Sequence, residues 1–214
     1  MKRNISAFFV ATIMLLSISS FAVLRYVEER STSLPYYGNA QIGTTLSNAR
    51  KKGIASIPYF SFTNQYGKTI DYSFVDHKIW VGDFFFTRCG SVCPKMNSHL
   101  QSVQKAYVGN NEVKMLSFTC DPAVDTPQML NNYADRYTTD HTQWQFLTGR
   151  KQDLYRFARK GLGIVATDGD GGADDFIHSQ NLVLVDGQGF VRGYYDGLDD
   201  QSVKQLILDI KKLL

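Results

Sequence analysis

The chain is 214 residues long, which suits one domain of ordinary size with an extension. Hydrophobic residues make up 43% and charged residues 20%, a composition that is typical of a globular protein and excludes a disordered one. A net charge of +3, with no basic run beyond Lys51-Lys52 and Lys211-Lys212, argues against binding of nucleic acid, and three cysteines are too few for a disulfide scaffold.

The N-terminus carries a long uncharged segment. Lys2 and Arg3 precede residues 5–24, which contain no charged side chain and are long enough to span a bilayer as a helix. Basic residues before the segment favour a cytoplasmic N-terminus, residues 1–4, and place the rest of the chain on the periplasmic side of the inner membrane. A cleaved signal peptide is the alternative. We favour a single-pass anchor because the apolar run is long for a signal sequence.

The segment after the expected anchor is polar and irregular. Residues 25–56 therefore indicate a tether with a short docking segment, and residues 57–214 are expected to form the globular domain. This domain begins with a predicted β-hairpin, in which residues 59–63 and 69–74 flank a turn that contains Gly67.

Two cysteines follow the next predicted strand. Residues 79–87 form an apolar and aromatic run that predicts a buried strand, and helical periodicity begins after Pro94. Cys89 and Cys93 therefore lie at a strand-to-helix junction, and their spacing lets both face one side of the first helical turn. A helix N-terminus favours a thiolate over a thiol. Such a pair could cycle between dithiol and disulfide or hold copper(I) or zinc, and the spacing does not separate these alternatives.

A second polar stretch follows another predicted strand, residues 113–119. Asp121 stands at the carboxyl end of that strand, where it either reaches the same rim as Cys89 or forms a local turn. Cys120 is left outside the Cys89–Cys93 pair, and the sequence assigns it no role.

The C-terminal half continues the alternation of helices and strands. The pattern predicts a helix from Thr126 and Pro127, a strand at 144–147, a helix at 150–160, a strand at 182–185, a turn at 186–189, a strand at 190–195 and a final amphipathic helix. Residues 167–175 form an acidic glycine-rich stretch without the glutamate that closes a calcium loop, so we expect a surface loop there. The order βαβαβαββα behind a hairpin predicts an α/β fold.

Three motifs in combination resemble those of the Sco (SenC) proteins, over the chain from about residue 57 to its end. They are Phe84-Phe85-Phe86-Thr87-Arg88-Cys89-Gly90-Ser91-Val92-Cys93-Pro94, Asp121-Pro122-Ala123-Val124-Asp125-Thr126-Pro127 and Ile177-His178-Ser179. The resemblance implies a thioredoxin-like fold with an N-terminal β-hairpin extension, preceded by a single transmembrane helix.

The resemblance also implies a copper site. Cys89 and Cys93 match two thiolate ligands, His178 matches an imidazole ligand, and Asp121 matches an acidic residue near the site. Two thiolates and one imidazole suit Cu⁺, and the imidazole also suits Cu²⁺. The chain departs from the family's usual pattern by having Gly90-Ser91 in place of a proline and an acidic residue, so we expect a more flexible and less negative loop.

The function implied is that of a membrane-tethered copper chaperone that assists assembly of the copper centre of cytochrome c oxidase. Its partners would be the copper-bearing subunit of the oxidase and other periplasmic copper carriers or thiol reductants. The alternative is a thiol–disulfide oxidoreductase that uses Cys89 and Cys93 to keep partner cysteines reduced for metallation. Whether the protein is an enzyme is therefore left open. A thiol peroxidase is disfavoured because Phe86 stands where such enzymes usually have threonine.

Overall fold

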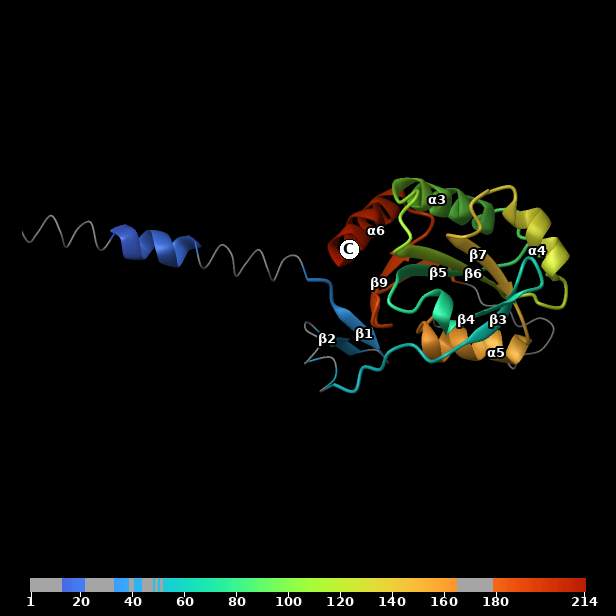
Figure 1. The fold of residues 1–214 in the computed structure, drawn as a ribbon, viewed down its shortest axis with the longest axis horizontal. Helices are drawn as coiled ribbons and strands as arrows, with labels where there is room; N and C mark the ends of the chain where they lie inside the picture. Colours follow the sequence, from blue (N-terminus) through green and yellow to red (C-terminus); the bar gives the residue numbers. More distant parts are fainter. Residues whose placement is uncertain are drawn as a thin grey trace, which may run out of the picture. The chain divides into compact units, whose positions relative to one another are not determined.

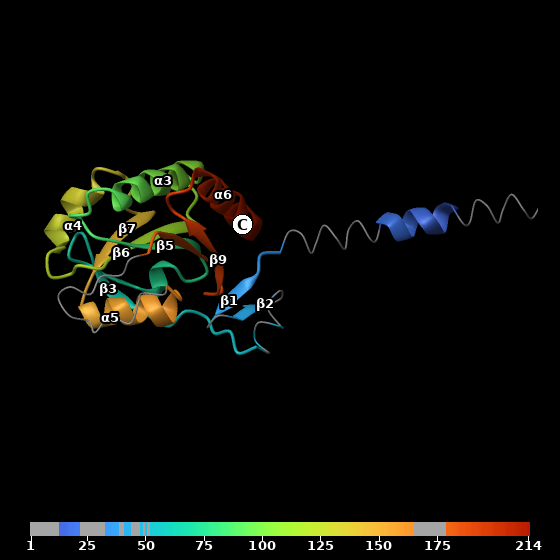
Figure 2. The same cartoon turned by 180° about the vertical axis from the view of Figure 1, so that it is seen from behind.

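The computed structural model in Figure 1 and Figure 2 describes residues 13–21, 33–38, 41–43, 48, 50, 52–164 and 179–214. The chain divides into two units, Met1–Ser33 and Leu34–Leu214, and each is described by itself.

The first unit contains a helix at residues 13–21, and its large apolar side chains, such as Leu15 and Phe21, are exposed. Among the residues that the structure describes, no helix has the length and apolar character needed to cross a membrane. The anchor predicted at residues 5–24 lies only partly within the described residues.

The second unit has the predicted alternation of strands and helices behind a hairpin. Its elements are β1 (Tyr36–Gly38), β2 (Gln41–Gly43), β3 (Ser61–Asn64), β4 (Thr69–Asp71), the 3₁₀ turn η1 (Tyr72–Phe74), β5 (Ile79–Phe85), α3 (Val92–Ala106), β6 (Val113–Thr119), α4 (Pro127–Ala134), β7 (Trp144–Thr148), α5 (Lys151–Arg156), the π-helical turn η2 (Phe157–Gly161), β8 (Asn181–Val185), β9 (Val191–Asp196) and α6 (Asp200–Leu213).

The described strands form one mixed sheet in the order β2-β1-β9-β8-β5-β6-β7-β3-β4. At its centre β5 runs parallel to β6, with Phe85 opposite Thr119, and β6 runs parallel to β7. On the other side, β8 pairs with β5 in the antiparallel sense, with Gly82 opposite Val183. The carboxyl ends of β5 and β6 and the start of β8 therefore lie at one edge of the sheet.

Helices cover both faces of this sheet, so successive side chains of its central strands enter two different cores. In β5, Ile79, Val81 and Phe85 face α3, α4 and α6, whereas Trp80 and Phe84 face α5 and η2. Figure 1 shows α3, α4 and α6 on one side of the sheet and α5 on the other. Burial on both faces explains why β5, apart from Asp83, is apolar along its length rather than alternating.

The hairpin predicted before β5 is present as β3 and β4, with Gly67 at its turn in a left-handed conformation (φ 72°). Its second strand is shorter than predicted. The side chain of Asp71 accepts hydrogen bonds from the N–H and hydroxyl groups of Ser73, which caps η1 and ends the strand.

Part of the segment expected to be a tether belongs to the folded unit. Tyr37 in β1 pairs with β9, and Leu34 is buried. The buried guanidinium of Arg192 donates to the carbonyl oxygens of Leu34 and Pro35 and forms an ion pair with Asp186 at 2.8 Å. The folded unit therefore begins at Leu34, before the hairpin.

The aromatic core on the α5 side generates a stability prediction. Phe118 is fully buried, and its ring centroid lies 5.1 Å from that of Phe157 and 5.3 Å from that of Phe84. Replacement Phe118→Ala leaves a cavity and should lower the free energy of unfolding by about 3–5 kcal/mol, measured by urea denaturation. The control Val108→Ala, at a side chain that is 76% exposed, should leave it nearly unchanged. Equal effects of the two substitutions would contradict this assignment of the core.

Candidate metal and redox site

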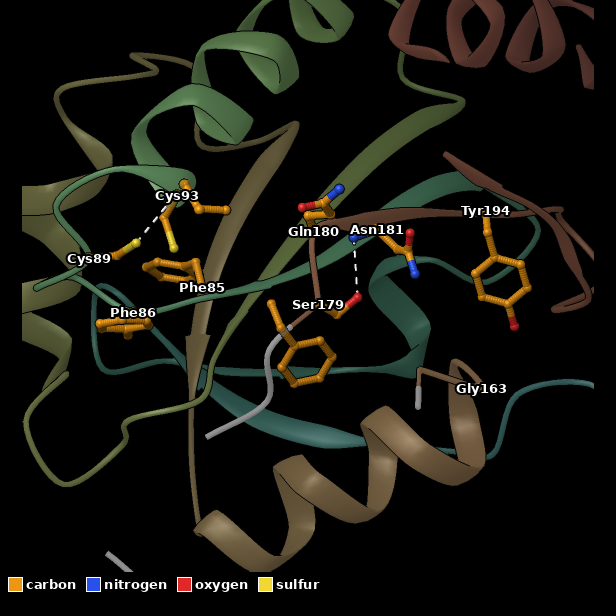
Figure 3. Close-up of a pocket in the computed structure, with 11 residues that line it drawn as sticks. Phe85, Phe86, Cys89, Cys93, Gly163, Ser179, Gln180, Asn181 and Tyr194 are labelled. Atoms are coloured by element: carbon orange, nitrogen blue, oxygen red, sulfur yellow. Dashed lines mark hydrogen bonds between the residues drawn. The ribbon is translucent and has the colours of Figure 1, made fainter. Parts of the chain in front are cut away.

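The two cysteines lie where the sequence predicts, between the end of β5 and the start of α3. A turn follows β5 and is closed by the Cys89 N–H group, which donates to the carbonyl oxygen of Phe86 at 3.2 Å. Helix α3 then begins at Val92, so Cys93 lies in its first turn. The Cys93 N–H group donates to the sulfur of Cys89 at 3.3 Å, which brings the two residues into direct contact (Figure 3).

The sulfur of Cys89 takes the place of a helix cap. Ser91 is the N-cap residue of α3, but its side chain makes no capping hydrogen bond. Burial of Cys89 raises the pKa of its thiol, and hydrogen bonds from the backbone N–H groups of Cys93, Ser91 and Val92 outweigh that effect, so the pKa is lowered overall. A sulfur that accepts from several N–H groups at a helix start is stabilised as a thiolate.

The second thiol is in a different environment. Cys93 is 5% exposed, whereas Cys89 is partly exposed. Burial raises the pKa of Cys93, and its hydrogen bond with Cys89 raises it further. The pair therefore consists of one accessible sulfur that favours the thiolate and one buried sulfur that retains its proton.

A cavity of about 580 Å³ opens beside the cysteines. Cys89, Cys93 and aromatic side chains of β5 line one side, and Ser179, Gln180 and Asn181 lie across it (Figure 3). These last residues lead into β8, whose antiparallel pairing with β5 carries them to this edge of the sheet.

His178, the third predicted ligand, lies outside the described residues, as does the acidic stretch at 167–175. The residue that follows it, Ser179, lines the cavity. Among the described residues, no group of three or more His, Cys, Asp or Glu side chains is arranged to hold a metal ion. The donor set available from the described chain is the two sulfurs, which suit a soft ion.

Asp121 lies at the predicted edge, and its carboxylate contacts Arg88, the residue before Cys89, at 2.6 Å. Cys120 is not brought to the pair: it is buried on the α5 side of the sheet, and its carbonyl oxygen accepts from the hydroxyl of Tyr155.

Sequence reasoning missed Asp125, the second carboxylate of the stretch after β6. It is fully buried and accepts hydrogen bonds from the N–H and hydroxyl groups of Thr87 and from the hydroxyl of Thr119. The signal that could have found it is the pair of acidic residues four apart at a strand end, with Asp121 as the other member.

Asp83 was missed as well. It lies within β5, is 1% exposed, and one carboxyl oxygen accepts from the hydroxyl of Ser117, which in turn accepts from the indole N–H of Trp144. The other carboxyl oxygen has no hydrogen-bond partner in the described structure. Burial raises the pKa of Asp83 to about 7 despite the Ser117 bond. A charged residue inside an apolar run was the available sequence signal.

Comparison with known proteins agrees with this geometry. The family model described as SCO1/SenC matches residues 48–214. A SCO1 protein homolog from Bacillus subtilis is 33% identical over 154 residues, which cover 71% of this chain and 79% of the relative. The chain belongs to the SCO1/SenC family.

Solved structures of the family share the fold. A SCO1/SenC family lipoprotein from Bacillus anthracis matches with a TM-score of 0.66 and 31% identity, covering 74% of this chain and 94% of that one. BsSco, described as a cytochrome c oxidase assembly protein with a disulfide switch, matches with a TM-score of 0.63 and 31% identity, covering 74% and 92%. Copper-bound ScoI from Bradyrhizobium japonicum, at 21% identity, 75% and 100% coverage and a TM-score of 0.61, supports the fold alone. The predicted α/β thioredoxin-like fold is confirmed.

The buried carboxyl of Asp83 predicts a pH-dependent stability. Its folded-state pKa of about 7 lies above its ordinary value, so between roughly pH 4 and 7 the unfolded chain ionises while the folded one keeps the proton. The free energy of unfolding should therefore fall with rising pH across this window, by about 4 kcal/mol in total, and level off above it.

Urea denaturation at pH 4.5 and pH 8, roughly the two ends of that window, tests this prediction. Asp83→Asn cannot ionise, so it should lose less stability between these pH values than the wild type. Asp76→Asn, at a side chain that is 51% exposed, serves as control and should follow the wild type. Identical pH dependence of Asp83→Asn and the wild type would contradict the assigned pKa.

Proposed function

We propose that this protein is a membrane-tethered copper chaperone that binds copper through Cys89, Cys93 and His178 and assists assembly of the copper centre of cytochrome c oxidase. The observation that carries the proposal is the edge of the sheet at which β5 ends and β8 begins, where the cysteine pair and Ser179 line one cavity. His178, the proposed third ligand, directly precedes Ser179 in the sequence.

The donor chemistry fits copper. Thiolates select soft ions, and hydrogen bonds from N–H groups at the start of α3 lower the pKa of the Cys89 thiol. Cys93 retains its proton in the metal-free protein, so binding of Cu⁺ by both sulfurs releases that proton. Partial exposure of Cys89 gives an incoming ligand of a partner protein access to the ion, as transfer by ligand exchange requires.

Relatives supply the biological setting. Copper-bound structures of the family have been solved, and BsSco is described as a member of a family of cytochrome c oxidase assembly proteins. The corresponding partner of this chain would be the copper-bearing subunit of an oxidase, with periplasmic copper carriers or thiol reductants as further partners.

The proposal includes attachment to a membrane. A lipoprotein of this family from Bacillus anthracis has been solved, and here the uncharged residues 5–24 would provide the anchor. Residues 1–4 would then be cytoplasmic, and the folded unit from Leu34 would lie on the periplasmic side of the inner membrane, joined to the anchor by a short tether.

A second candidate function is thiol–disulfide exchange, which the unequal thiols and the disulfide switch identified in BsSco favour. The Cys89 thiolate would attack a partner disulfide, forming a mixed disulfide and releasing one partner thiolate. Cys93, after losing its proton, would attack the Cys89 sulfur and release the second partner thiolate. The partner disulfide is thereby reduced to two thiols, and Cys89 and Cys93 are oxidised to a disulfide.

Titration with Cu⁺ against a competing chelator tests the copper proposal. The wild type should bind one tight equivalent, the Cys89→Ser/Cys93→Ser variant should lose it, and His178→Ala should bind more weakly. His77→Ala, a change at an 87% exposed histidine, is the matched control and should bind as the wild type does. Tight binding that survives in His178→Ala would contradict the ligand assignment, and no tight binding in the wild type would leave thiol–disulfide exchange as the function.

The unequal thiols predict unequal reactivity in the reduced, metal-free protein. Iodoacetamide should alkylate Cys89 well before Cys93, because the thiolate is the nucleophile and Cys93 is buried. Mass spectrometry of peptides over a time course measures both rates. Cys120→Ser provides the background in which only the pair can react, and equal rates at Cys89 and Cys93 would refute the assigned asymmetry.

A further inference from the structure

Two turns face each other at the carboxyl ends of β5 and β6. The first turn, residues 86–89, is closed by the hydrogen bond from the Cys89 N–H group to the Phe86 carbonyl oxygen. The second turn, residues 121–125, is closed by the Asp125 N–H group, which donates to the carbonyl oxygen of Asp121 at 2.9 Å. The parallel register of the two strands brings the turns together, because Phe85 lies opposite Thr119.

Side chains of the second turn hold the two central residues of the first. Asp125 accepts from both the N–H and the hydroxyl group of Thr87, with the N–H donating at 3.2 Å to one carboxylate oxygen. Asp121 forms an ion pair with Arg88, whose side chain is 60% exposed. The outer contact has its guanidinium largely in solvent and is therefore of small energetic value, whereas the inner contact is made by a carboxylate that is fully buried.

The inner contact is anchored to the sheet. The hydroxyl of Thr119, the last residue of β6, donates to Asp125 and accepts from the N–H group of Asp121. The donors to Asp125 are thus one N–H group and two hydroxyls, all uncharged. A buried carboxylate is costly unless it is hydrogen-bonded, so the geometry of these donors is what stabilises the charge in place.

We propose that Asp125 is a positioning residue for Cys89: from its anchor on Thr119 it holds Thr87 and so fixes the turn that brings the Cys89 sulfur to the N-terminus of α3. This inference deepens the proposed function and rests on it where copper is concerned. The quantity that Asp125 controls in this proposal is the distance between the Cys89 sulfur and the Cys93 N–H group. That distance depends on where the turn leaves β5.

Asp125→Asn is the sharpest variant because it keeps the size of the side chain. An amide has one acceptor oxygen and one NH₂ donor group, whereas all the groups that contact Asp125 donate. In Asp125→Asn at least one hydrogen bond is therefore lost, and the NH₂ group faces another donor. Thr87→Val removes one hydroxyl and leaves the carboxylate and the Thr87 N–H bond, and it serves where Asp125→Asn fails to fold. Thr87→Ser restores the hydroxyl.

The control is Asp209→Asn. Asp209 is equally a buried carboxylate, 5% exposed, that accepts from the hydroxyl of Tyr195 and pairs with Lys212, and it lies on α6 rather than at the cysteine turn. Both variants should lower the melting temperature of the purified full-length protein, so thermal unfolding gives the structural cost common to losing a buried carboxylate.

The decisive readouts are the redox equilibrium of the Cys89–Cys93 pair with a thiol buffer and the Cu⁺ affinity. Loss of the hydrogen bond to the Cys89 sulfur destabilises the reduced pair, so Asp125→Asn should shift the equilibrium towards the disulfide by roughly tenfold. Its Cu⁺ affinity should fall by roughly 10- to 100-fold, as for other groups that orient a metal ligand. Thr87→Val should shift both in the same direction, whereas Thr87→Ser and Asp209→Asn should stay near the wild-type values.

The two hypotheses fail separately. If the wild type binds Cu⁺ tightly and folded Asp125→Asn or Thr87→Val matches it in both readouts, Asp125 has a structural role only and the positioning proposal is wrong. If the wild type binds no tight Cu⁺, the proposed copper function is wrong, and the redox equilibrium of the same variants still decides whether Asp125 positions Cys89.

Discussion

The site depends on the register of β5 between its two neighbours. Parallel pairing with β6 places Phe85 opposite Thr119, so the chain leaves both strands at the same edge and the two following turns face each other. Antiparallel pairing with β8 brings the start of that strand to the same edge. A slip of one residue in either pairing would move Asp125 away from Thr87 or turn Asn181 to the other face of the sheet. The register of the core therefore sets the geometry of the chemistry.

The start of α3 gives the two thiols pKa shifts of opposite direction. A helix leaves its first N–H groups without partners, and here the sulfur of Cys89 accepts from them in place of a side-chain cap. Cys93, in the first turn of α3, lies in the core, where burial favours its protonated form. Both proposed functions, copper binding and disulfide exchange, use the two sulfurs of the pair together. The same local geometry therefore supports both functions, which explains why cysteine spacing alone does not separate them.

The sequence predicted the parts of the structure that depend on local pattern. Apolar runs and helical periodicity gave the strands and helices of the α/β core, and the position of Cys89 and Cys93 followed from the strand-to-helix junction. The roles of Asp125 and Asp83 were not predicted, because their partners, Thr87 and Ser117, lie more than 30 residues away in the chain. The three-residue strand β1 was not predicted, because it is too short to show a period of two. The segment before it is held by a hydrogen bond from Arg192 of β9 to Leu34. Long-range hydrogen bonds decide these features.

The three ligands proposed for copper come from two stretches of the chain that are far apart in sequence. Cys89 and Cys93 are positioned by the end of β5, by the turn that Asp125 contacts through Thr87, and by the first turn of α3. The proposed imidazole ligand comes instead from the residue before Ser179, at the end of the connection that leads into β8. Fixed sulfurs keep the pair ready to form either a disulfide or two bonds to copper. In the proposed function, a ligand from a partner protein would replace the third ligand on the ion while the two sulfurs stay in place.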